Sequence, residues 1–193
     1  MRMFILMGVI VLAVVGFIVT IVDQRANRAV MCALSGMSRG YSFRTCLYAL
    51  AQMRHETNNF TSNLFERANN VSGMKKPTVR ATKGIVSVSN GYAVYNTVWN
   101  SMADYWLRQN AFSMPKSFVS IEAFSKWNKD SRYYEDSLDN YTARLKFWYN
   151  SYGSGDGMYI SIFFVCLLVN ICAISYGVYW LLRFTKSVKK FKR

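Results

Sequence analysis

Residues Met158 to Leu182 read MYISIFFVCLLVNICAISYGVYWLL, a run of 25 residues without a charged side chain. The hydrocarbon core of a bilayer is about 30 Å thick and needs about 20 apolar residues of helix to cross it. Tyr159 stands near one end of the run and Trp180 near the other, which is the arrangement of aromatic residues at membrane interfaces. This stretch, residues 158–182, therefore predicts a transmembrane helix.

A basic tail follows this apolar run over residues 183–193, without an acidic residue in it. Short basic segments beside a span stay on the cytoplasmic side, so the tail predicts the orientation of the chain. Its positive charges also predict contact with the anionic headgroups of membrane lipids. The predicted lipid-contact residues are Arg183, Lys186, Lys189, Lys190, Lys192 and Arg193.

A second uncharged run, Met3 to Val22, opens the chain and predicts another span over residues 1–22. A cleaved signal peptide is the alternative, but the apolar run is long for one and no small-residue cleavage site closes it. Two spans place both termini in the cytoplasm and residues 23–157 on the opposite side. We therefore expect an integral membrane protein with two spans.

Between the two runs, residues 23–152 show apolar side chains at helical spacing in three long stretches, 42–72, 78–112 and 117–152. Residues 84–95 are rich in Val, Ile and Tyr, which favours a strand, but the helical spacing continues through them. Long amphipathic helices must bury their apolar faces together. The sequence thus predicts an all-α membrane protein in which two transmembrane helices flank an antiparallel, coiled-coil-like bundle, with a Gly-rich joint at 153–157 before the second span.

Composition narrows the function classes. Hydrophobic residues make up 52% of the chain, too many for a disordered protein. The net charge of +14 suits an anionic surface, yet the basic residues are scattered and no nucleic-acid-binding motif occurs, so we expect no nucleic-acid partner.

Cys32 and Cys46 would pair in an oxidising compartment and otherwise pack as small apolar side chains. No residues are spaced for a metal or cofactor, so we expect none.

Three short motifs lie in the middle of the chain: Leu50 to Glu56, Leu64 to Ala68, and a stretch from Ser117-Phe118 through Ala143-Arg144 to Tyr149-Asn150. They resemble motifs of the LemA family of membrane-anchored helical-bundle proteins. The first is similar to that family's tyrosine–alanine–x–histidine–glutamate stretch, the second to its leucine–phenylalanine–glutamate positions, and the third to its late helix. The resemblance implies a LemA-like helical bundle over residues 23–152. The second span is atypical for that family.

Candidate catalytic groups are few. His55 and Glu56 are adjacent and could form a pH-sensitive pair, although a solvated helix face is the simpler interpretation. An acidic cluster on the last amphipathic stretch alternates with Lys129 and Arg132, which is typical of a solvated, salt-bridged surface. This cluster consists of Asp130, Glu135, Asp136 and Asp139. The sequence therefore predicts no catalytic residue and no small-molecule substrate.

The second span carries a pattern for helix association. Ala173 and Gly177 are four residues apart and Asn170 lies one turn earlier, so the helix could approach another closely and share a hydrogen bond. Together these features predict a non-enzymatic, membrane-anchored scaffold that self-assembles as a homo-oligomer or binds protein partners. Two alternatives are a small phage or viral membrane protein for lysis or membrane remodelling, and an accessory subunit of a large membrane complex.

Overall fold

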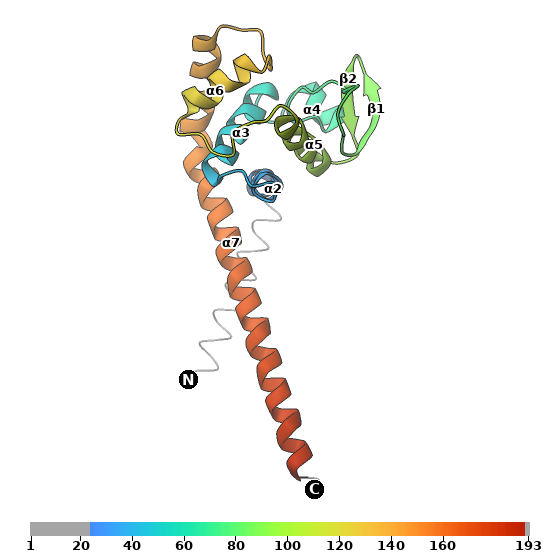
Figure 1. The fold of residues 1–193 in the computed structure, drawn as a ribbon, viewed down its shortest axis with the longest axis vertical. Coiled ribbons are helices and arrows are strands. Elements are labelled where there is room, and N and C mark those ends of the chain that lie inside the picture. The colour runs from blue at the N-terminus through green and yellow to red at the C-terminus, as the bar shows by residue number, and fades with distance from the viewer. Residues whose placement is uncertain (1–23, 192–193) are drawn as a thin grey trace. The chain divides into compact units, whose positions relative to one another are not determined.

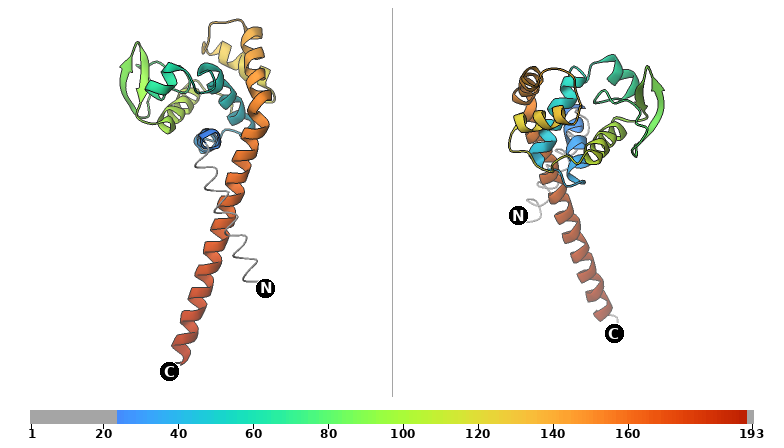
Figure 2. Two further views of the ribbon diagram at one scale, coloured as in Figure 1. Left: turned by 180° about the vertical axis from the view of Figure 1, so that it is seen from behind. Right: turned by 45° about the horizontal axis from the view of Figure 1, so that its top comes forward.

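The computed structural model describes residues 24–191, except for the side chains of residues 173, 177 and 180–191. Residues 28–157 form one compact unit, and α7 continues from it into a second. The elements in chain order are α2 (Gln24–Met37), α3 (Phe43–Glu56), α4 (Asn63–Ala68), β1 (Ile85–Ser89), β2 (Tyr92–Tyr95), α5 (Val98–Ala111), α6 (Ile121–Asp130) and α7 (Leu138–Phe191). Within the first unit, α3 lies between α6 on one side and α4, α5 and the hairpin on the other (Figure 1). The view from behind shows the same order (Figure 2).

The first predicted long helix, residues 42–72, is divided into α3 and α4. Ser42 caps α3 by accepting a hydrogen bond from the backbone N–H of Thr45 at 3.2 Å. The helix ends at Glu56 because the following backbone turns left-handed, with φ of +47° to +64° over residues 58–60. Asparagine tolerates this conformation better than most residues, and Asn58 and Asn59 supply two of the three positions.

The second predicted helix, residues 78–112, was wrong in its first half. Strands β1 and β2 form an antiparallel hairpin in which Ser89 pairs with Tyr92 and Val88 with Ala93. Its turn is Asn90-Gly91, with φ of +50° and +80°, the sequence that two-residue hairpin turns favour. Helix α5 begins only at Val98, after the Thr97 cap. The β-branched and aromatic composition outweighed the helical spacing.

The third predicted helix, residues 117–152, is two helices. Ser120 caps α6 by accepting from the N–H of Ala123. The chain then leaves the helix through Arg132, whose φ is +53°, before α7 begins at Leu138. In the structure α7 passes through residues 153–157 without interruption.

Trp106 joins α5 to α2 and to the loop before α3 in the core. Its indole N–H donates to the carbonyl of Cys32 on α2 at 3.2 Å, and its ring stacks on Tyr41 with centroids 4.7 Å apart. A Cβ on Gly36 would lie 2.6 Å from the Trp106 ring, so only glycine allows α2 to approach this closely. The thiols of Cys32 and Cys46 are buried nearby and unbridged, and burial raises the pKa of Cys46 to about 12.

The predicted all-α, two-span membrane bundle was wrong. The described chain contains short helices and a small sheet instead of long antiparallel helices. Within residues 24–191, one helical stretch, Leu138–Tyr176, is long and apolar enough by length and composition to cross a membrane. The other predicted span, Met3–Val22, lies outside the described residues. One candidate span does not support the predicted topology, in which both termini are cytoplasmic and the domain lies on the opposite side.

A buried ion pair joins α3 to α7 inside the first unit. The guanidinium of Arg54 contacts both carboxylate oxygens of Asp156, at 2.8 and 3.0 Å, and each side chain is 3% exposed. Arg54 also donates to the side chain of Asn59 and lies 4.4 Å from the ring centre of Tyr152. This pair therefore fixes the end of α3 and the left-handed turn that follows it.

Replacing Asp156 with asparagine keeps the side-chain volume but removes the carboxylate opposite a buried guanidinium. We expect Asp156→Asn to lower the free energy of unfolding by about 3–5 kcal/mol, because a buried charge that loses its partner is strongly destabilising. Denaturant unfolding of the detergent-solubilised chain measures this. The matched control is Asp130→Asn, which breaks an exposed pair with Lys126 and should cost less than about 1 kcal/mol. Equal losses in the two variants would contradict a structural role for the buried pair.

Candidate active site

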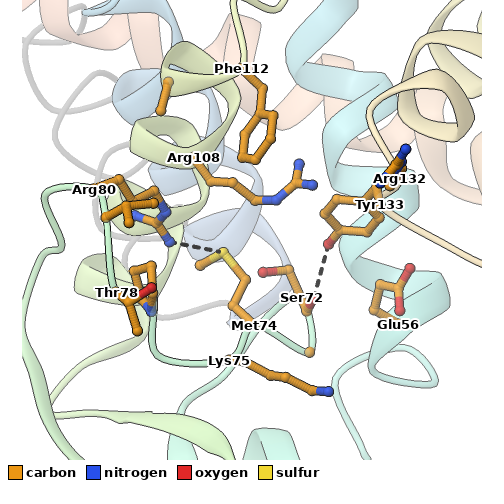
Figure 3. A pocket seen from close by; sticks show the side chains of 14 residues that line it. Glu56, Ser72, Met74, Lys75, Thr78, Arg80, Arg108, Phe112, Arg132 and Tyr133 are labelled. Atoms are coloured by element: carbon orange, nitrogen blue, oxygen red, sulfur yellow. Dashed lines mark hydrogen bonds between the residues drawn. The ribbon is translucent and has the colours of Figure 1, made fainter.

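A cavity of about 720 Å³ opens in the first unit beside the end of α3. This volume lies within the range of about 300–1,000 Å³ that is typical of ligand sites. Four segments line the cavity: the last residue of α3, residues 72–80 after α4, the end of α5, and residues 132–133 before α7 (Figure 3). Glu56 is the one carboxylate among the described residues of this lining.

Asn70 shapes the wall that faces Glu56. Its side-chain amide donates to the carbonyls of Met74 and Ala93, at 2.8 and 2.9 Å, and its oxygen accepts from the N–H of Met74 at 3.0 Å. These bonds tie the loop to β2 and hold Gly73 at φ +62°. A Cβ on Gly73 would lie 3.9 Å from Oε2 of Glu56, so this oxygen faces the part of the cavity wall that Gly73 forms.

A chain of uncharged hydrogen-bonding groups positions Glu56. The hydroxyl of Tyr141 on α7 donates to Oε1 of Glu56 at 3.0 Å and accepts from the amide of Gln52 at 2.9 Å. The oxygen of Gln52 accepts in turn from the hydroxyl of Tyr105 at 2.6 Å. Gln52 and Tyr105 are fully buried, so the chain is rigid. It fixes Oε1 and leaves Oε2 as the oxygen beside Gly73.

The environment of Glu56 favours its neutral form. Burial raises the pKa of this carboxyl from 4.5 to about 7, and the hydrogen bond from Tyr141 opposes the shift only in part. Glu56 is also the last residue of α3, where the partial negative charge of a helix C-terminus disfavours a carboxylate. A carboxylic acid that holds its proton near neutral pH can serve as a general acid.

His55, the other member of the predicted pair, does not lie on a freely solvated helix face. Its ring meets the ring of Tyr141 edge-on, with centroids 5.3 Å apart. Burial, and then the nearby Arg144, lower the pKa of this imidazole, while Asp136 opposes them. His55 therefore packs behind the tyrosine that holds Glu56, and it is absent from the cavity lining.

The acidic cluster and the predicted membrane residues are absent from the lining of the cavity. Asp130 forms an exposed ion pair with Lys126, and Asp136 contacts Arg144 at 3.3 Å. Asn170 donates within α7 to the carbonyl of Cys166 at 2.7 Å. Ala173, Gly177, Arg183, Lys186, Lys189 and Lys190 follow on the same helix, and Lys192 and Arg193 lie outside the described residues.

The residues that support Glu56 were not predicted from the sequence. Gln52 and Glu56 are four residues apart and therefore share one face of α3, which was the available signal of a polar site on this helix. Tyr141 is 85 residues away in the chain, and no local pattern connects it with Glu56.

A lone carboxylic acid with a raised pKa, held at the wall of an open cavity, is the arrangement of an acid–base enzyme site. The Glucosaminidase family model, described as mannosyl-glycoprotein endo-beta-N-acetylglucosaminidase, matches residues 36–154, and this chain belongs to that family. The match covers more than half of the chain and all four segments of the cavity wall. No curated protein and no solved structure matches the chain.

The family assignment and the single candidate span in residues 24–191 together correct four sequence-based predictions. The resemblance to LemA was wrong, because the matching family is Glucosaminidase, and the LemA-like bundle is wrong with it. The prediction of a non-enzymatic scaffold was wrong, because this family consists of enzymes. The predicted two-span location of the domain is also wrong, given one candidate span in residues 24–191. The alternative of a protein for lysis is closer, since the family hydrolyses peptidoglycan.

The raised pKa of Glu56 makes stability depend on pH. Below about pH 4.5 the group is protonated in both the folded and the unfolded chain, and between 4.5 and 7 only the folded chain keeps the proton. This contribution to stability is therefore lost as pH rises through 7. The variant Glu56→Gln stays neutral at both pH values. We therefore expect its free energy of unfolding, taken relative to that of wild type, to be about 3 kcal/mol higher at pH 8 than at pH 4, at about 1.4 kcal/mol per pKa unit. Denaturant unfolding at both pH values tests this, and a constant difference would contradict the raised pKa.

The hydrogen bond from Tyr141 lowers the pKa of Glu56, so its removal should raise that pKa further. We expect Tyr141→Phe to shift the titration of the Glu56 carboxyl, followed by ¹³C NMR of glutamate-labelled protein, to higher pH. Tyr149→Phe is the matched control, since Tyr149 lies on the same helix but packs its ring on Tyr48. A titration that is unchanged in Tyr141→Phe would remove this tyrosine from the site.

Proposed function

We propose that this protein hydrolyses the β-linkage of N-acetylglucosamine in a cell-wall glycan, with Glu56 as the general acid. The observation that carries the proposal is the partly buried Glu56 carboxyl at the cavity wall, with its pKa near 7 and its orientation fixed by Tyr141. The family assignment of residues 36–154 supports the substrate linkage, and its role in peptidoglycan hydrolysis supports the wall polymer as substrate.

In this mechanism the proton on Oε2 of Glu56 passes to the glycosidic oxygen as the bond to the anomeric carbon breaks. The leaving sugar departs as an alcohol, and Glu56 becomes a carboxylate. Tyr141 donates to Oε1 throughout, which stabilises the carboxylate as it forms and keeps the proton on the oxygen beside Gly73.

Most glycosidases use two carboxylates, of which the second attacks the sugar or activates water. The described lining of this cavity supplies one. Asp104, which lies nearby on α5, is buried and accepts from Arg80, from Tyr95 and from the N–H of Lys83. Attack on the anomeric carbon then falls to water or to the acetamido oxygen of the substrate itself, the route of the substrate-assisted families.

A cell-wall substrate agrees with the sequence-based alternative of a protein that acts in lysis, since opening the wall is one step of lysis. The predicted contacts between the basic tail, residues 183–193, and anionic lipid stay a prediction, as does self-association through Asn170, Ala173 and Gly177. Neither is needed for the chemistry at Glu56.

The test is the release of new reducing ends from purified peptidoglycan by the full chain in detergent, identified by borohydride reduction and mass spectrometry. We expect N-acetylglucosamine at the new reducing ends, and a decline in kcat as pH rises above about 7, where Glu56 loses its proton. Glu56→Gln should lower kcat by at least about 100-fold, because loss of a general acid commonly removes a factor of 10²–10⁴.

The matched control is Glu122→Gln, which changes an exposed carboxylate that pairs with Lys146 and lies outside the cavity. This variant should keep wild-type activity. Activity retained by Glu56→Gln would exclude Glu56 as the acid. Cleavage of a high-mannose glycoprotein, with peptidoglycan left intact, would exclude the wall polymer as the substrate.

A further inference from the structure

The cavity beside Glu56 carries an excess of positive charge. Four basic residues line it, against a single carboxyl that is neutral at moderate pH. The chemistry proposed above uses Glu56 and Tyr141 and assigns no role to these cations. The four are Lys75, Arg80, Arg108 and Arg132.

Arg80 differs from the other three because its charge is already neutralised. Its guanidinium forms a two-pronged ion pair with Asp104, at 2.8 and 2.9 Å, and the Asp104 side chain is fully buried. The pair anchors the loop before β1 on α5. Arg80 therefore stabilises the cavity wall through this ion pair. Among the described residues, no carboxylate forms an ion pair with Lys75, Arg108 or Arg132.

Arg108 is held in place by aromatic rings. Its guanidinium lies 4.6 Å from the ring centre of Phe112 and 4.5 Å from that of Tyr133, and one nitrogen donates to Gln109 at 2.9 Å. Figure 3 shows this guanidinium directed toward Tyr133, between α5 and the loop that carries Arg132. Stacking orders the planar group before a ligand arrives, which reduces the entropy lost on binding.

Arg132 and Lys75 approach the cavity from separate loops. The left-handed backbone at Arg132 is stabilised by hydrogen bonds from its own N–H to Lys129 and from Tyr133 to Asn128, both at 2.9 Å. A strained conformation of this kind persists where the surroundings enforce it, often at a functional site. Lys75 lies two residues after Gly73, and its backbone pairs with that of Tyr92 in the hairpin as an isolated antiparallel β-bridge.

We propose that Lys75, Arg108 and Arg132 form a subsite for a carboxylate on the sugar next to the cleaved bond. This inference rests on the proposed function, because that function places the cleaved bond at Glu56. In glycan strands of peptidoglycan that have lost their stem peptides, every second sugar carries a 3-O-lactyl group that ends in a free carboxyl. A guanidinium binds a carboxylate through two parallel hydrogen bonds, and a second and third cation add attraction without a fixed geometry.

The test compares an acidic and a neutral form of one disaccharide. Full-length protein carrying Glu56→Gln, which retains the cavity but lacks the acid, is titrated in detergent with N-acetylglucosaminyl-N-acetylmuramic acid and with its methyl ester. We expect the acid to bind about tenfold more tightly than the ester, with a preference that weakens at high salt. Adding Arg108→Gln should abolish the preference while leaving the affinity for the ester unchanged.

Two further variants separate binding from folding and from net charge. Lys75→Gln lies on an exposed loop and should reduce the preference without loss of structure by circular dichroism. Arg67→Gln removes an exposed cation from α4, outside the cavity, and should change neither affinity. Equal affinities for acid and ester, or no binding of the acid at millimolar concentration, would overturn the subsite.

The outcomes also separate the subsite from the proposed function. Hydrolysis of peptidoglycan by the wild type, combined with equal binding of acid and ester, retains the function and rejects the subsite. A preference for the acid that depends on Arg108, in a protein that hydrolyses no glycan, retains the subsite and rejects the function.

Discussion

The ion pair between Arg54 and Asp156 is the interaction on which the site depends. It fixes α3 against α7 at Asp156, and the same guanidinium binds Asn59 in the left-handed turn. The helix must therefore stop at Glu56, with its carboxyl at the negative end of the helix dipole. Because Asp156 neutralises Arg54, a cation only two residues before Glu56 does not impose the ionised form on that carboxyl. One buried pair thus sets both the position and the electrostatic environment of the acid.

The group that donates a hydrogen bond to Glu56 is uncharged, and this decides the chemistry of that carboxyl. A guanidinium in the place of Tyr141 would hold the carboxyl ionised, whereas a phenol orients it and still leaves burial as the dominant influence on its pKa. Behind Tyr141, the side chains of Gln52 and Tyr105 are uncharged as well. The Gln52 amide donates to Tyr141 and its oxygen accepts from Tyr105, so these hydrogen bonds form without adding charge. The positive side chains of the cavity come from the end of α5 and from two loops.

The sequence allowed part of this structure to be predicted. The apolar run of α7 is a local feature, and it was recognised from the uncharged residues themselves. The hairpin was missed because helical spacing was given more weight than Asn90-Gly91, whose left-handed turn brings β1 and β2 together. Asn58 and Asn69 could likewise have indicated breaks in the helix, since both have positive φ where a continuous helix was expected. The acidity of Glu56 could not be predicted, because it depends on burial by segments distant in the chain and on a hydroxyl from α7.

An acid and a cationic wall within one cavity oppose one another, since positive charge lowers the pKa of a nearby carboxyl. In the unliganded cavity burial prevails, and the Glu56 pKa stays near 7. A substrate carboxylate bound by Arg108 and its two neighbours would neutralise that wall and exclude water, and both changes favour the protonated form of Glu56. The anionic substrate would then raise the pKa of the group that must protonate its own glycosidic bond. A neutral glycan of the same size would lack this coupling, so the cationic wall would select substrates through the protonation of the acid as well as through binding.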